Sequence, residues 1–147
     1  MTSYLIAGPG EEPVTLAEAK AWCRIDAGDE DALLTALIAA ARLHVEALTG
    51  RALITQTWRL VLHHAPRLVE LPVVPAATLV EAPDGAVLQG DCVLLRAPVD
   101  DLIIDYTAGY GDAADVPQDL KQASSKPGRW CCSGWGGRWR RGIAGCL

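Results

Sequence analysis

The sequence predicts an α+β protein in which two N-terminal helices pack on a small antiparallel β-sheet. Apolar residues recur at helical spacing up to residue 50, and the period then shortens to two through residue 110. The apolar runs after residue 50 are joined by short links, as in an antiparallel sheet. Helices followed by a run of strands are typical of α+β domains. A C-terminal helix start at Pro117 and an irregular tail complete the expected order.

The first helix is expected at TLAEAKAWCRI, residues 15–25. Thr15 and Glu18 have capping-box spacing, in which each side chain accepts a hydrogen bond from the other residue's backbone N–H. Apolar residues then form one face: Leu16, Ala19, Trp22 and Cys23. We expect this helix to end between Asp26 and Gly28.

The second helix is predicted over residues 29–50. Acidic residues at 29–31 suit the positive end of a helix dipole, and Gly50 suits a left-handed C-terminal cap. An apolar stripe runs along it: Leu34, Leu37, Ile38, Ala41, Val45 and Leu48. Leu33 and Ala40 widen this stripe. A stripe of this width indicates burial against both the helix's own sheet and a neighbour.

Five or six strands follow in sequence, at residues 57–62, 67–72, 78–88, 92–97 and 101–110. In the last of them Leu102, Ile104 and Tyr106 alternate with Ile103, Asp105 and Thr107, the pattern of a half-buried strand. The run 78–88 contains Pro83-Asp84-Gly85 between two apolar stretches. Because glycine adopts the positive φ of tight turns, this run predicts a hairpin.

The charges divide the chain into two parts, a domain at residues 1–123 and a tail at residues 124–147. The domain contains 18 acidic and 8 basic residues, a net charge of −10, whereas the tail contains 5 basic residues and no acidic one. Proteins that bind nucleic acid through its phosphates need Lys and Arg. The sequence therefore predicts that the domain does not bind nucleic acid in this way, whereas the basic tail can.

The sequence contains few residues that are placed for catalysis or metal binding. His63 and His64 point to opposite faces of their strand, and no carboxylate pair has a histidine or lysine placed to tune it. An odd number of cysteines, five, predicts no disulfide framework, and their spacing predicts no zinc site. No signal peptide and no membrane-spanning run is expected. We predict no catalytic site, metal or cofactor.

The tail is rich in Trp and Arg, residues that dominate protein contact sites. We predict that these residues dock a partner: Trp130, Trp135, Arg138, Trp139, Arg140 and Arg141. Two alternatives stay open, an end without a role and a small nucleic-acid-binding module that uses the basic tail.

Two stretches resemble the head–tail connector (adaptor) proteins of long-tailed bacteriophages and gene transfer agents. Residues 12–60 carry a capped short helix, an acidic link, a long Ala-rich helix ending in LTGRAL and a TQTW strand. Residues 101–123 carry YTAGYG leading into a VP helix. The resemblance implies a non-enzymatic structural protein. It further implies a ring, commonly of twelve copies, between the portal and the stopper or tail proteins, through which double-stranded DNA passes without sequence-specific binding.

The resemblance also implies self-association through the helices. We expect the subunit interface to include Leu34, Leu37, Ile38, Ala41 and Val45. The implied location is the bacterial cytoplasm during assembly and then the head–tail junction of the particle, with no membrane partner. The chain departs from the family pattern at Ser124. The tail is therefore either a frame-altered end of a GC-rich gene or a recruited peptide that contacts the portal.

Overall fold

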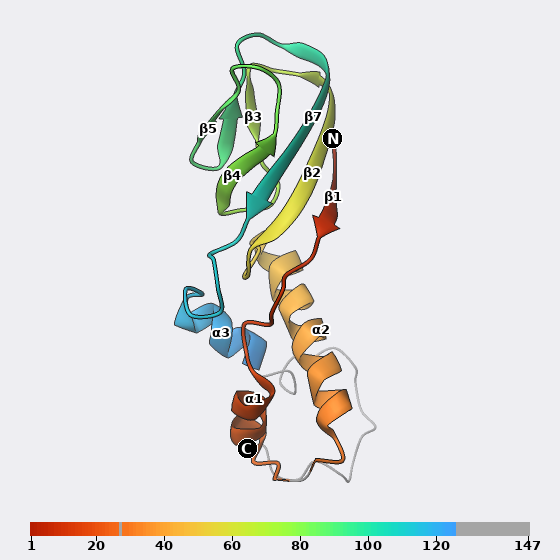
Figure 1. The fold of residues 1–147 in the computed structure, drawn as a ribbon, viewed down its shortest axis with the longest axis vertical. Helices are drawn as coiled ribbons and strands as arrows, with labels where there is room; N and C mark the ends of the chain where they lie inside the picture. Colours follow the sequence, from red (N-terminus) through yellow and green to blue (C-terminus); the bar gives the residue numbers. More distant parts are fainter. Residues whose placement is uncertain (27, 126–147) are drawn as a thin grey trace.

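The computed structural model describes residues 1–26 and 28–125. Helices gather at one end of an elongated molecule and two β-sheets at the other (Figure 1). The α+β class and the antiparallel pairing are confirmed. The structure adds that the helices lie beyond the end of the sheets instead of over a sheet face (Figure 1).

The first two helices follow the caps expected from the sequence. Helix α1 spans Leu16–Cys23, and Thr15 and Glu18 form both hydrogen bonds of the capping box. It ends earlier than expected because Arg24 takes a left-handed conformation with φ 55°. Helix α2 spans Asp31–Thr49 and ends at Gly50, whose φ of 65° is the predicted left-handed cap.

Helix α3 spans Gln118–Ser125 and packs against α2 (Figure 1). Val116, just before α3, is buried with Val45 of α2 and with Leu53 and Ile54, which follow α2. Ala19 of α1 is buried with Ile38 of α2 and Val14. Helix α2 is therefore the centre of the helical end. It packs against both shorter helices.

A four-stranded sheet has the order β1-β2-β7-β4. Its strands are Thr2–Ala7 (β1), Gln56–Ala65 (β2), Val99–Ala108 (β7) and Ala76–Glu81 (β4). All neighbours in it are antiparallel, and β2 and β7 form its long central ladder. No strand was predicted before the first helix, so β1 is an element that the structure adds.

The smaller sheet has the order β3-β6-β5, with strands Leu68–Glu70 (β3), Cys92–Leu94 (β6) and Val87–Gln89 (β5). The hairpin predicted at Pro83-Asp84-Gly85 is wrong. The turn itself forms, with Ala86 N–H donating to Pro83 O and Gly85 at φ 77°, but the strands on its two sides enter different sheets. Strand β5 pairs with β6, so the hairpin forms around Gly90.

The main core lies between the two sheets. The expected alternation in β7 is confirmed, because Leu102, Ile104 and Tyr106 have no exposed surface while Ile103 is exposed. Leu60 of β2 and Val93 of β6 are buried in the same cluster. This core leaves the opposite face of the four-stranded sheet open, which antiparallel sheets tolerate.

Candidate assembly surfaces

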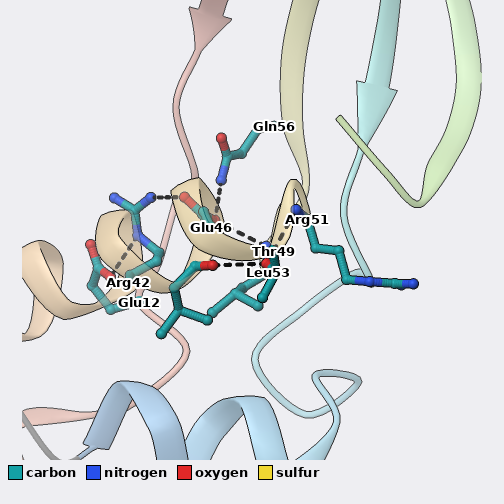
Figure 2. Close-up of polar contacts among 8 residues, drawn as sticks. Glu12, Arg42, Glu46, Thr49, Arg51, Leu53 and Gln56 are labelled. Atoms are coloured by element: carbon teal, nitrogen blue, oxygen red, sulfur yellow. Dashed lines mark hydrogen bonds and ion pairs between the residues drawn. The ribbon is translucent and has the colours of Figure 1, made fainter. Parts of the chain in front are cut away.

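Arg42 and Glu46 lie one turn apart on α2 and connect the helical end to the sheet end (Figure 2). Arg42 Nη1 is 2.8 Å from Glu46 Oε2, and its Nε is 2.9 Å from Glu12 Oε2 in the segment between β1 and α1. Burial lowers the pKa of Arg42, but the hydrogen bonds and charges of Glu12 and Glu46 outweigh it and raise the pKa above its ordinary value. The guanidinium thus stays charged in a nearly closed site.

The other oxygen of Glu46 binds the start of β2 and the segment leading to it. Glu46 Oε1 accepts from Leu53 N–H at 2.9 Å and from Gln56 Nε2 at 2.7 Å (Figure 2). Gln56 is the first residue of β2 and is buried. One carboxylate therefore satisfies a buried backbone donor, a buried amide and a buried cation. This arrangement fixes how α2 enters the sheet.

A second contact between the helical end and the sheets lies at Gly109, where two backbone segments approach closely. Gly109, which directly follows β7, has φ 138°, and a Cβ built there would lie 2.5 Å from Ile54 O. Only glycine permits so close an approach of two backbones. Beyond it, Thr55 N–H donates to Gly111 O, and Arg51 Nη1 donates to the Tyr110 hydroxyl at 2.7 Å.

The expected interface residues of α2 divide into two groups. Leu34, Ile38 and Val45 are buried inside the subunit, each at most 6% exposed. Leu37 and Ala41 are half-buried. The three buried side chains have almost no surface left to offer another copy, because they pack within the helical end. An interface through all five residues stays a prediction, and the exposed surface of α2 lies elsewhere.

The exposed face of α2 carries its own apolar stripe, here called the outer stripe: Leu33, Ala36, Ala40, Leu43 and Ala47. These positions are spaced alternately three and four residues apart, so they lie along one side of the helix. Leu33 is 59% exposed and Leu43 is 55% exposed. A solvent-facing helix side is usually charged, whereas this one is uncharged throughout.

By length and composition alone, α2 is also apolar enough to cross a membrane. Its apolar character has a simpler basis in the fold. One side packs against α1 and α3, the outer stripe is a second apolar side, and the charges of Arg42 and Glu46 are used inside the subunit.

The open face of the four-stranded sheet carries an ion pair between adjacent strands. Arg59 of β2 holds Asp105 of β7 through two hydrogen bonds of 2.6 and 2.5 Å. The hydrogen bond from Arg59 lowers the pKa of Asp105, and the hydrogen bond to Asp105 raises the pKa of Arg59. Around this pair Tyr4 and Ile103 are exposed.

Two histidines each lie beside a carboxylate at the far end of the β2–β7 ladder. His63 Nδ1 lies 2.5 Å from Asp101 Oδ1, and His64 Nδ1 lies 3.1 Å from Asp100 Oδ1. All four side chains are exposed. In residues 1–26 and 28–125 no group of three His, Cys, Asp or Glu side chains is placed to hold a metal ion.

The tail residues predicted to dock a partner lie outside the described residues. Those residues are Trp130, Trp135, Arg138, Trp139, Arg140 and Arg141. Helix α3 includes Ser124, which is buried, so the helix continues past the expected domain boundary at residue 123.

Uncovered apolar surfaces on a firmly joined two-part subunit are typical of a protein that works in an assembly. The comparisons agree with this class, since residues 13–89, more than half of the chain, match the family of phage gp6-like head-tail connector proteins. The chain belongs to this family. Comparison with curated proteins gave no match.

Solved structures with the same fold come from gene transfer agent (GTA) particles. A chain in the virion of a native GTA particle is 23% identical with a TM-score of 0.78, over 96% of this chain and 89% of that one. A chain in the neck of an empty GTA particle, computed with C6 symmetry, is 24% identical with a TM-score of 0.77, over 99% and 91%. A chain in the neck of a native GTA particle, computed with C12 symmetry, is 25% identical with a TM-score of 0.68, over 96% and 88%.

Proposed function

We propose that this protein is a non-enzymatic subunit of a ring between the portal and the stopper of a phage-like particle. Membership of the head-tail connector family supports this role. The neck structures with C6 and C12 symmetry support a ring of identical copies, twelve in the simplest case. The ring forms in the bacterial cytoplasm and then remains at the head–tail junction.

The outer stripe is the observation that carries the proposal. A subunit that worked alone would leave five apolar positions of α2 in water, whereas an assembled ring removes them from it. Leu37 and Ala41, beside the stripe, have partial exposure and can extend the same contact. We therefore place the helix contact between subunits on the outer stripe, and not on the buried residues of the interface predicted from the sequence.

We also propose that double-stranded DNA passes through the ring without binding it specifically. The net charge of −10 on residues 1–123 supports this, because acidic walls repel phosphates and let the duplex slide. The Trp and Arg residues of the tail suit docking to the portal. A basic channel lining would contradict the sliding role.

Electron microscopy of particles from cells that lack this protein tests the function. Heads without attached tails are expected, and a plasmid copy of the gene should restore tailed particles. A reconstruction of the restored particles should show a ring of this chain at the neck. Tailed, infectious or DNA-delivering particles in normal numbers without the protein would contradict the proposal.

A further inference from the structure

Both edges of the four-stranded sheet are without a partner strand among the described residues, β1 at one edge and β4 at the other. An unpaired edge presents backbone N–H and C=O groups on which a further strand can pair. Soluble proteins usually block such edges with Lys, Pro or very short strands. Strands β1 (TSYLIA) and β4 (AATLVE) are six residues each and contain neither Lys nor Pro. Each has a register irregularity against its neighbour, between Leu5 and Ala7 in β1 and at both ends of the β4 ladder, and the regular stretches between these irregularities are open for pairing.

Exposed apolar side chains lie on both edges. Tyr4, Leu5 and Ile6 of β1 are 43–47% exposed, and Val80 of β4 is 61% exposed. Strand β1 carries no charge at all, and β4 carries only Glu81 at its end. An edge of this length with exposed apolar residues and almost no charge is suited to pairing with another strand.

The strand directions decide which strand fits. Each strand of the sheet is antiparallel to its neighbours, so β1 and β7 run one way while β2 and β4 run the other. A second copy in the same orientation, placed beside β4, brings its β1 next to β4 with the opposite direction. The antiparallel alternation then continues from one copy to the next.

We propose that β1 of one copy pairs with β4 of the next, so that the four-stranded sheets join around the ring. The inference rests on the proposed ring and names the surfaces that meet in it. A ring needs two different, complementary surfaces on each subunit, because identical patches facing each other close a two-fold dimer. The edge strands β1 and β4 are two such surfaces, because they differ in sequence, have the same length and run in opposite directions.

Charged substitutions on the two edges test the pairing. We expect Leu5→Lys and Val80→Glu each to weaken subunit association by about tenfold or more, since each places an uncompensated charge in the strand pairing. The double variant Leu5→Lys with Val80→Glu should recover more association than Leu5→Lys with Val80→Lys, because opposite charges on adjoining strands attract and like charges repel. Native mass spectrometry of the full chain and electron microscopy of particles measure the ring.

A matched control lies on the other sheet. Val87 is an exposed residue of β5, an edge strand of the smaller sheet, and Val87→Lys should leave the ring intact. Thermal unfolding of each variant shows whether the subunit is folded. If Leu5→Lys does not fold, Ile6→Lys replaces it, because Ile6 lies at a bulge without a partner residue in β2.

The possible outcomes separate the two proposals. Rings that form normally in Leu5→Lys and Val80→Glu overturn the strand pairing and leave the ring function standing. A two-fold dimer that depends on β1 and not on β4 also overturns it, because β1 would then pair with its own copy. Particles that contain no ring of the wild-type chain overturn the proposed function itself.

Discussion

Glu46 on α2 and Gln56 at the start of β2 are joined by a hydrogen bond of 2.7 Å. The same carboxylate oxygen accepts from Leu53 N–H, and the other accepts from Arg42. One side chain that satisfies three donors therefore contributes to the orientation of the helical end relative to the sheets (Figure 2).

Glu46→Ala should lower the free energy of unfolding by about 2–4 kcal/mol, because it leaves buried donors and the Arg42 charge without this acceptor. Glu46→Gln should cost less, since its amide oxygen still accepts from Leu53 N–H or Gln56. Urea unfolding followed by far-UV circular dichroism measures both. Equal and small losses in the two variants would show that the junction does not depend on Glu46.

Thr15→Ala should cost about 0.5–2 kcal/mol, the usual effect of removing an N-cap side chain. Its hydroxyl accepts from Glu18 N–H at 3.2 Å, and Glu18 accepts in return from Thr15 N–H at 2.8 Å. Thr35→Ala is the matched control, because Thr35 only donates to a carbonyl within α2. In thermal unfolding, the midpoint of Thr35→Ala should lie near that of the wild type and above that of Thr15→Ala. A lower midpoint for Thr35→Ala than for Thr15→Ala would contradict the role of the cap.

Gly109→Ala should be far more destabilising than Gly90→Ala. Both glycines have positive φ, but a Cβ at Gly90 meets no atom within 4 Å, whereas one at Gly109 meets the backbone of Ile54. Gly90→Ala therefore carries only the conformational cost, about 1 kcal/mol. Denaturant midpoints of the two variants compare them directly, and similar midpoints would contradict the close approach.

The Arg59–Asp105 pair makes stability depend on acid pH. Because the folded-state pKa of Asp105 lies below its unfolded value, the pair stabilises the fold above the unfolded pKa of about 3.9. This contribution is lost as the pH falls through the lower, folded pKa. Asp105→Asn should therefore differ from the wild type at pH 7 and approach it in strong acid. Unfolding curves between pH 7 and pH 2 test this, and a constant difference would count against it.

Leu43→Glu should leave the subunit folded and reduce its assembly. Leu43 lies on the outer stripe at 55% exposure, so the substitution removes little internal packing. Ile38→Glu, on the buried side of α2, should unfold the helical end instead. Light scattering and circular dichroism on both variants separate the two effects. Normal assembly of Leu43→Glu would exclude the outer stripe from the interface.

Local signals predicted the elements well. The capping box at Thr15 and Glu18, the left-handed cap at Gly50 and the alternation in β7 are each decided by neighbouring residues, and each is confirmed. The turn at Gly85 formed for the same reason, but the partner of each flanking strand is set by packing between sheets. A turn motif therefore does not predict which strands pair on its two sides.

Non-local relationships could not be predicted. Arg42 and Glu12 are 30 positions apart, and nothing in their spacing indicates an ion pair. The apolar positions of α2 occupy more than one side, so periodicity alone could not show whether Leu34 or Leu33 faces the core. In the folded chain α2 packs against α1 and α3, and Leu34 is buried while Leu33 is exposed.

Among the described residues, only three segments join the helices to the sheets, at residues 8–15, 50–55 and 109–117 (Figure 1). Glu12 in the first segment and Leu53 in the second are tied to the same helix by Arg42 and Glu46. A mechanical load on one end of the molecule is thus transmitted to the other by a braced joint. Bending between the helical end and the sheets would have to break these buried ion pairs and hydrogen bonds.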